Sequence, residues 1–290
     1  MFDYYEIDSK DFQSNSKINF NFVPDYPSLC YAVAKELATL IRRKSAIGEM
    51  ATVILPVGPI DYGIVADYMN KEKLSCKSLV VFAMDEYINS DGLPLPANHP
   101  LSFRSFLYNQ LVNNLDRPLR IPEDQIILPT PEIMDQIPGV IQSYGGIDIT
   151  FGGLGVNGHF AFNSPLDHPI DIETFKNTSV RVVNLREGDV TQFALYGTNG
   201  NLETIPTKAC TLGMRELLSA RKIFLTFMRN WHAGALRRAL FGPITPTFPG
   251  SLIQLHQNVY ATITPEAAAM PCHDLLMGIK GLSPRVEEIP

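Results

Sequence analysis

Short apolar runs that alternate with amphipathic stretches constrain the fold of this chain more than any other feature of its sequence. The runs 51–56 (ATVILP), 79–84 (LVVFAM) and 222–228 (KIFLTFM) are typical of strands buried on both faces of a parallel sheet. Segments between such runs place apolar residues on one helical face, for example Leu29, Val33 and Leu37. The pattern predicts an α/β fold of three layers (αβα), with a doubly wound, mainly parallel, Rossmann-like sheet between helices.

The 290 residues are enough for one large α/β domain or for two small ones. We expect residues 1–27 to form an N-terminal extension whose piece 18–22 is an edge strand or lies on the body of the protein. Residues 28–290 are expected to form a single domain. Further helices are predicted at 102–115, with Ser102 as N-cap, and at 209–218 and 231–241.

The stretch 167–208 interrupts this alternation. It is polar, contains several glycines and one proline in its second half, and has one predicted strand at 179–185. An irregular stretch of this length in a compact domain is typical of a lid, a binding segment or a surface excursion.

The composition limits the kinds of partner. A net charge of −6 argues against nucleic acid or an anionic membrane as the main partner, but not against a small anionic ligand. No apolar run approaches the roughly 20 residues that span a bilayer, and the acidic start MFDYYEIDSKDF is not a signal peptide, so a cytoplasmic location is expected. Four scattered cysteines and six dispersed histidines predict reduced thiols, no metal site and no cofactor.

Two groups of polar residues are expected to converge at one edge of the sheet. A glycine-rich turn follows the apolar run 147–151 and leads to His159, while the run 79–84 delivers Asp85 and Glu86. Glycines there let the backbone approach a ligand, and ligands bind at the carboxyl edge of open α/β sheets. The alternatives are a structural histidine and a solvated strand end. We favour a site centred on His159.

Four motifs carry a resemblance to a known family: MDEY (84–87), NHPLSF (98–103), GGLGVNGHFAFNSP (152–165) and LIQLH (252–256). Together they resemble the glucosamine-6-phosphate deaminases (isomerases), which share a superfamily with the 6-phosphogluconolactonases, over about 28–267. The resemblance implies that Asp85, with Glu86 beside it, moves a proton between C2 and C1 of a sugar, and that His159 helps to open the ring. The substrate contacts that it implies are Gly58, Gly153, Gly155, Asn163 and His232.

The chain departs from the family next to the histidine. The family has an aspartate two residues before the histidine and a glutamate five after it, where this chain has Asn157 and Ser164. We keep both positions in the predicted catalytic set, but neither supplies a carboxylate to orient the imidazole and stabilise its charged form. On this hypothesis, Asn157→Asp together with Ser164→Glu increases ring-opening activity.

The expected phosphate site also departs from the family. A threonine–glycine–glycine–threonine loop is replaced by Val57–Ile60, in which Pro59 removes an N–H donor. The family's phosphate-binding lysine falls on His232, which is expected to bind an anion more strongly as the pH falls, and its arginine falls near Leu195. Arg181 and Arg186 are candidate replacements for that arginine.

These observations leave three functions open. The first is aldose–ketose isomerisation of a sugar or amino-sugar phosphate, with deamination of an amino sugar. The second is a catalytically silent sugar-binding or regulatory protein, and the third is hydrolysis of a sugar lactone. The expected partner is a small sugar or sugar phosphate, and family members are often oligomeric, so a homo-oligomer is possible.

Overall fold

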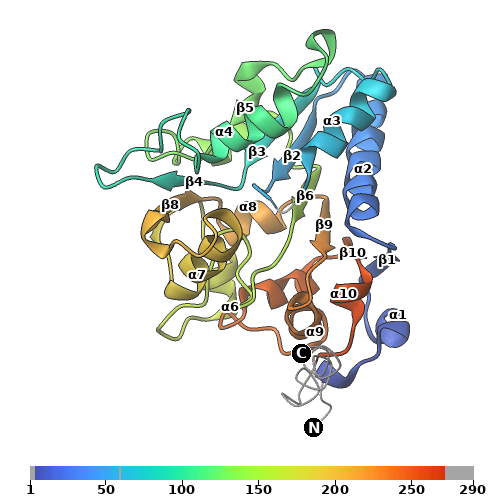
Figure 1. Cartoon of the computed structure of the whole chain (residues 1–290), viewed down its shortest axis with the longest axis vertical. Coiled ribbons are helices and arrows are strands. Elements are labelled where there is room, and N and C mark those ends of the chain that lie inside the picture. Colours follow the sequence, from blue (N-terminus) through green and yellow to red (C-terminus); the bar gives the residue numbers. More distant parts are fainter. Residues whose placement is uncertain (1–3, 59, 272–290) are drawn as a thin grey trace, which may run out of the picture.

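A seven-stranded parallel sheet forms the centre of the protein (Figure 1). The computed structural model describes residues 4–58 and 60–271. The order of the strands is β1-β10-β9-β6-β2-β3-β5, and every neighbouring pair is parallel. Their bounds are Asn19–Phe22 (β1), Ala51–Leu55 (β2), Leu79–Ala83 (β3), Ile126–Ile127 (β5), Ile149–Gly152 (β6), Lys222–Phe227 (β9) and Val259–Ile263 (β10). The predicted doubly wound α/β sheet is confirmed.

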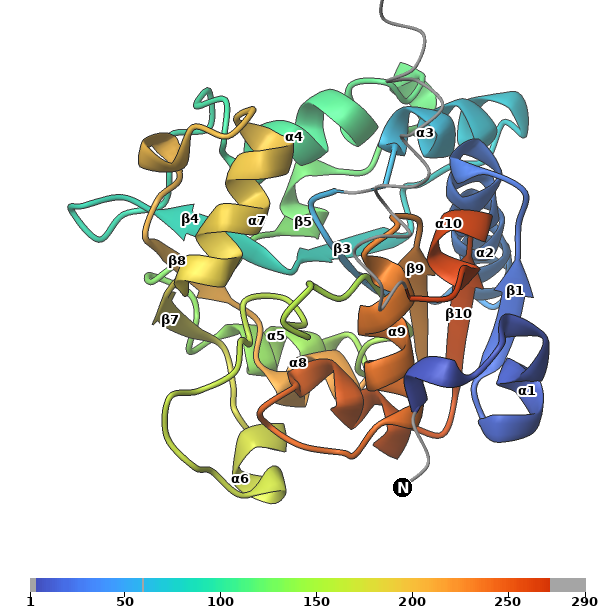
Figure 2. The ribbon, with the colours of Figure 1, turned by 60° about the horizontal axis from the view of Figure 1, so that its bottom comes forward.

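Helices cover both faces of this sheet (Figure 2). One face packs against α2 (Tyr26–Ala46) and α3 (Tyr62–Lys71), and the other against α5 (Ile137–Ser143), α8 (Met214–Leu218) and α9 (His232–Phe241). Within β2, Val53 and Leu55 pack in the core on the side of α2 and α3, and Ile54 packs in the core on the side of α5, α8 and α9. Because neighbouring strand residues point to opposite faces, an entirely apolar strand supplies both layers at once.

A second, three-stranded antiparallel sheet lies beside the main one. It consists of β4 (Asp85–Ile88), β8 (Lys208–Thr211) and β7 (Arg181–Asn184). The predicted helix 209–218 is therefore wrong in its first half, where Lys208–Thr211 pairs with strands on both sides and helix α8 begins only at Met214. A short apolar run does not by itself distinguish a strand from a buried helix.

The stretch 167–208 is more regular than predicted. Besides β7 it contains α6 (Ile172–Lys176), a 3-10 turn (Leu202–Thr204) and helix α7 (Glu187–Gly197). Both views show α7 beside β8, and Ala194 of α7 packs with Tyr87 of β4 and Ala209 of β8 (Figures 1 and 2).

The predicted helix 102–115 divides into α4 (Phe103–Leu107) and a π-helical turn (Tyr108–Val112), with Ser102 as the predicted N-cap. The remaining short helices of the described residues are Tyr4–Glu6, Ser9–Asp11, Phe12–Asn15 (α1), Arg117–Leu119, Glu123–Gln125, Pro249–Leu255 and Pro265–Ala268 (α10).

The N-terminal segment provides β1, an edge strand parallel to β10, so the first of the two predicted placements of 18–22 is the observed one. Phe12 and Ile18 are buried in the main core. The boundary between an extension at 1–27 and a domain at 28–290 stays a prediction.

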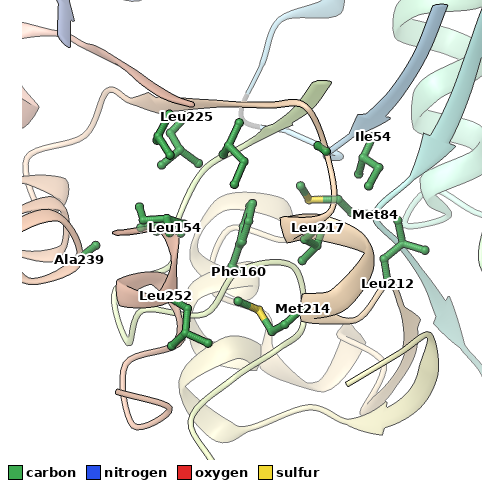
Figure 3. Close-up of a cluster of buried hydrophobic side chains, with 14 of the residues drawn as sticks. Ile54, Met84, Leu154, Phe160, Leu212, Met214, Leu217, Leu225, Ala239 and Leu252 are labelled. Atoms are coloured by element: carbon green, nitrogen blue, oxygen red, sulfur yellow. The ribbon is translucent and has the colours of Figure 1, made fainter. Parts of the chain in front are cut away.

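The glycine-rich turn after β6 is held by a buried aromatic ring. Figure 3 shows Phe160 surrounded by apolar side chains that include Leu154, Met214 and Leu252. A Cβ atom at Gly152 would lie 2.6 Å from Cε2 of Phe160, so only glycine lets this ring pack under the end of the strand. The packing fixes the path of the chain one residue after His159.

Candidate active site

A cavity of about 780 Å³ opens at the carboxyl ends of the central strands. The loops after β2, β3, β6 and β9 line it, together with α7 and the segment 100–106. In the sheet, β3 lies on one side of β2 and β6 lies on the other, so the order of the strands reverses at β2. The cavity lies at this switch point of the topology. Open α/β sheets bind ligands at such points, and the volume suits a small molecule.

The predicted site residues divide into two groups. Those that line the cavity are Gly58, Asp85, Gly153, Gly155, His159 and His232; those that do not are Glu86, Asn157, Asn163 and Ser164. Pro59 lies outside the described residues. The structure thus brings Asp85, His159 and His232 together from three distant parts of the sequence.

Asp85 occupies the first position of β4, directly after the carboxyl end of β3. Its side chain is only 7% exposed, and one oxygen accepts the Phe162 N–H at 3.2 Å. The N–H reaches it because Ala161 has a left-handed backbone (φ 53°), a rare conformation for a residue with a Cβ. Burial raises the pKa of Asp85 to about 7, against hydrogen bonds to Thr211 and Phe162 that lower it.

His159 is held against a glycine. A Cβ at Gly155 would lie 2.1 Å from Cε1 of the imidazole, so the ring occupies the space of the missing side chain. Phe193 of α7 stacks on the ring at a centroid distance of 6.2 Å and an angle of 16°. Nδ1 lies 2.8 Å from the side-chain oxygen of Asn157 and 2.8 Å from Oδ1 of Asp189. Both neighbours accept, so Nδ1 carries a proton and Nε2 is left for a ligand.

Asp189 also lies beside His159, although the sequence does not predict it to belong to the site. It lies in the first turn of α7, is 1% exposed, and also accepts hydrogen bonds from Asn157 Nδ2 (2.8 Å) and Ser164 Oγ (2.5 Å). Although burial opposes ionisation, hydrogen bonds from His159, Ser164 and Asn157 and the charge of His159 lower the pKa of Asp189. Positions 157 and 164 supply no carboxylate, as the sequence indicates, but Asp189 of α7 brings one to 2.8 Å from Nδ1 of His159. The only local signal was an acidic residue near the start of a helix, in a stretch predicted to be irregular.

Glu86 does not belong to the cavity, and its place in the predicted catalytic set needs correction. Its carboxylate accepts the backbone N–H groups of Tyr87, Phe103 and Arg104 at 2.9–3.0 Å and the hydroxyl of Ser102 at 3.1 Å. The carboxylate thus satisfies the free donors at the start of α4. Adjacent residues of a strand face opposite sides, so Asp85 and Glu86 do not act on one ligand.

Asn163 is also a structural residue. It is fully buried, donates to the carbonyl oxygens of Phe160 and Leu212 at 2.9 Å, and accepts from Arg181 at 2.9 Å. These contacts fix the end of the glycine-rich turn. Asn163 is not among the residues that line the cavity, and its role as a substrate contact stays a prediction.

His232 is neutral, contrary to the expectation that it gains charge as the pH falls. Its Nδ1 accepts the backbone N–H groups of Met228 (2.9 Å) and Arg229 (3.0 Å). Burial, together with the nearby charge of Arg229, lowers the pKa of His232 to about 3, against a hydrogen bond to the backbone of Leu154. The imidazole fixes the start of α9 and supplies no positive charge to the cavity.

The cation of the cavity is Arg229. It is the only Lys or Arg among the described residues that line the cavity, and no ion pair of the described residues involves it. Its guanidinium carbon lies 3.5 Å from the ring centroid of Tyr196, at the far end of α7. The two predicted replacements are engaged outside the cavity, Arg181 with Asn163 and Arg186 with Asp167.

In 4–58 and 60–271, no group of three or more His, Cys, Asp or Glu side chains is arranged to hold a metal ion. Cys30, Cys76 and Cys210 are buried and free, and Cys272 lies outside the described residues. No helix in the described part of the chain is long and apolar enough to cross a membrane.

Together, the fold and the cavity define a doubly wound α/β protein with a carboxylate and an imidazole at its switch point. The chain is 30% identical over 260 residues to a glucosamine-6-phosphate deaminase of Rhodopirellula baltica, an alignment that covers 87% of this chain and 96% of the relative. A Clostridium botulinum enzyme of the same name is 29% identical over 255 residues, or 85% and 96% of the two chains. The chain belongs to the glucosamine-6-phosphate deaminase family.

Solved structures agree on the fold. A monomeric glucosamine-6-phosphate deaminase matches with a TM-score of 0.76 and 24% identity, over 88% of this chain and all of the other. A 6-phosphogluconolactonase from Thermotoga maritima matches with a TM-score of 0.59 and 15% identity, over 85% and 99% of the two chains. No model of a known protein family matches the sequence.

Proposed function

We propose that the protein catalyses aldose–ketose isomerisation of a sugar phosphate, with deamination when the substrate is a 2-amino sugar. The observation that carries the proposal is Asp85, a carboxylate with a pKa of about 7 in the same cavity as an imidazole. A general base works best when its pKa lies near the working pH, and a positioned base contributes about 10²- to 10⁴-fold to the rate. The names of the relatives supply the substrate class.

The first chemical step in this proposal opens the sugar ring. The proton on the C1 hydroxyl must leave and the ring oxygen must gain one, so a group that exchanges protons near both atoms is needed. His159 suits this role because its Nδ1 is engaged with Asn157 and Asp189 while its ring lines the cavity. Imidazole is the side chain best suited to exchange protons at neutral pH.

The second step moves a proton between adjacent carbons. Asp85 removes the proton at C2, next to the C1 aldehyde, and returns it to C1, while the C1 oxygen gains a proton and the hydroxyl or amine at C2 loses one. In a 2-amino sugar the product of this transfer is an imine at C2, and water then releases ammonia and leaves the ketose. Because Asp85 must be ionised to begin, turnover is expected to rise with pH through about 7.

The charge of Arg229 favours the binding of an anionic substrate. Its charge has no carboxylate partner among the described residues, and the N-terminus of α9 lies beside it in the cavity wall. A helix N-terminus and a guanidinium both favour a phosphate group. We therefore assign the phosphate to the Arg229 side of the cavity and the reacting carbons to the Asp85 side.

Incubation in heavy water tests the proposal. Wild-type protein with glucosamine 6-phosphate or fructose 6-phosphate should incorporate deuterium at the exchanging carbon, and the amino sugar should also yield ammonia. Asp85→Asn should abolish both, whereas Asp91→Asn, the same change at an exposed residue of the loop after β4, should not.

Two other outcomes would replace the proposal with one of the alternatives. Binding of these sugars without any exchange would favour a silent sugar-binding protein. Hydrolysis of 6-phosphogluconolactone without exchange would favour a lactonase, because that reaction needs an activated water and no base at C2.

A further inference from the structure

The carboxylate of Asp189 lies at the centre of a closed set of donors. Asn157 Nδ2–H donates to Oδ1, and Ser164 Oγ–H and the Arg186 backbone N–H (3.3 Å) donate to Oδ2. The fourth contact is Nδ1 of His159, which lies 2.8 Å from Oδ1 of Asp189 and also 2.8 Å from the side-chain oxygen of Asn157. A carboxylate has room for about four such bonds, so this one is fully satisfied although it is buried.

We propose that Asp189 is the positioning residue for His159, and that Asn157 and Ser164 are the donors that hold it there. In this arrangement a carboxylate from helix α7 takes the place of carboxylates on the histidine's own loop. The inference rests on the function proposed above, because it assigns Asp189 a part in the step that His159 performs.

The donor pattern explains why positions 157 and 164 are not acidic. Asn157 must turn its oxygen toward the backbone N–H of His159 (3.0 Å), which turns its NH₂ toward Asp189. An aspartate at 157 or a glutamate at 164 would bring an acceptor and a second negative charge against Asp189. The amide of Asn157 and the hydroxyl of Ser164 are donors, so both are compatible with the carboxylate of Asp189.

A purely structural role for Asp189 does not account for the geometry. Its bond to the Arg186 N–H, which closes the first turn of α7, is the longest of the four contacts. A residue needed only for that turn could remain in water, yet Asp189 is 1% exposed and 2.8 Å from a ring that lines the cavity. Gln192 and Phe193 add contacts between α7 and the histidine loop, so the helix holds the carboxylate in place.

Asp189→Asn tests the inference. We expect kcat to fall about 10- to 100-fold with KM little changed, the range for loss of one charge-assisted hydrogen bond. The control is Glu187→Gln, the same loss of charge at an exposed residue of the same helical turn, which should behave as wild type. The decisive variant is the exchange Asn157→Asp with Asp189→Asn, which returns one carboxylate to Nδ1 and should restore kcat to within about threefold.

A proton NMR measurement without substrate detects the contact between His159 Nδ1–H and the Asp189 carboxylate directly. An imidazole N–H bonded to a buried carboxylate gives a strongly downfield signal, assigned here by its absence in His159→Gln. The signal should be lost in Asp189→Asn and return in the exchange variant. Full turnover and an unchanged signal in Asp189→Asn would overturn the inference, as would a folded exchange variant that recovers neither.

Failure of the proposed function would look different. If the wild type exchanges no proton with any sugar phosphate, the isomerase proposal fails, while the NMR signal still decides whether Asp189 holds His159. If Asp189→Asn does not fold, the exchange variant decides alone, because it regains turnover and signal only if a carboxylate at 157 replaces the one at 189.

Discussion

The two ends of the cavity, the one at His159 and the one at Arg229 and His232, both depart from the family pattern expected from the sequence, but they differ in which charged groups they contain. At the imidazole end, Asp189 reaches His159 from a helix thirty residues further along, and its oxygens are matched by donors. At the end proposed to bind the anion, His232 is neutral where the resemblance implies a lysine, and among the described residues that line the cavity the only Lys or Arg is the half-buried Arg229, which stacks on Tyr196.

This difference implies that one end of the cavity determines the rate of turnover and the other determines the affinity for the ligand. A buried, fully bonded carboxylate permits one orientation of the imidazole, which is what positioning for a chemical step requires. A half-exposed guanidinium on an aromatic ring can shift to meet anions of different size and reach. We therefore expect changes at the first end to alter turnover and stability, and changes at the second to alter binding.

The largest expected effect comes from restoring the family's residues. Asn157→Asp with Ser164→Glu should lower the free energy of unfolding by about 3–5 kcal/mol, the cost of an uncompensated buried charge, and turnover by more than about 100-fold. Three carboxylates would then face one another with two of the four donors to Asp189 removed. Urea unfolding at pH 8 and an isomerisation assay measure both.

This expectation reverses the one drawn from the sequence. The exchange variant, Asn157→Asp with Asp189→Asn, is the control, because it keeps the number of carboxylates constant. A double variant with improved turnover and unchanged stability would mean that Asp189 does not serve His159, and that the two ends of the cavity are equally depleted of charge.

The second effect concerns Asp85, where a substitution is expected to raise the stability of the protein rather than lower it. Its folded-state pKa of about 7 is raised above the ordinary 3.8, so the folded protein binds this proton more tightly than the unfolded chain. The resulting stability is fully present below about pH 4 and is lost as the pH rises through about 7. Asp85→Asn, which never ionises, should therefore be more stable than wild type at pH 8 by a few kcal/mol, and much less so at pH 4.

Thermal unfolding of the two proteins across pH 4–8 checks this, with Asp91→Asn as the surface control. A constant difference across the range would show that Asp85 is not held with a raised pKa, and would remove the main support for its role as a base.

The sequence predicted the positions of Asp85 and His159 because their signals are local. An apolar run ends just before Asp85, a glycine-rich turn leads from the end of another run to His159, and the parallel topology brings strand ends to one edge. Glu86 could have been excluded by the same reasoning, since the alternation of a strand places it on the opposite face from Asp85. The structure adds that this face is occupied by the start of α4.

Asp189 and His232 could not be assigned in this way. The contact of Asp189 with His159 depends on how α7 packs across the glycine-rich turn, which no local pattern encodes. For His232, the residue type indicates a titratable group, but two backbone N–H groups and burial keep it neutral. Charge at a site thus depends on partners that the sequence does not place.

A smaller effect is expected at Arg229. Arg229→Gln should weaken the binding of a sugar phosphate about 10- to 100-fold, the equivalent of one charge-assisted hydrogen bond, with little change in turnover at saturation. Arg43→Gln, an equal change at an exposed residue near the end of α2, is the control. Calorimetry with glucosamine 6-phosphate measures it. An unchanged Kd would place the anion elsewhere and end the distinction between the two ends of the cavity.

The smallest effect is expected at His232, and it distinguishes a neutral ring from a titrating one. A sugar 6-sulfate is the suitable ligand, because its charge is constant where a phosphate monoester gains a proton near pH 6. Asp85→Asn is the suitable background, because it removes a carboxylate that titrates near pH 7 in the same cavity. In that background, the change in Kd between pH 8 and pH 5 should be the same with His232 and with His232→Gln, since a group with a pKa of about 3 gains no charge in this range. Glutamine retains an acceptor for the Met228 and Arg229 N–H groups, so the start of α9 should persist. Binding that strengthens toward pH 5 only when His232 is present would show that the ring becomes charged, and that the anion end of the cavity recovers a second cation.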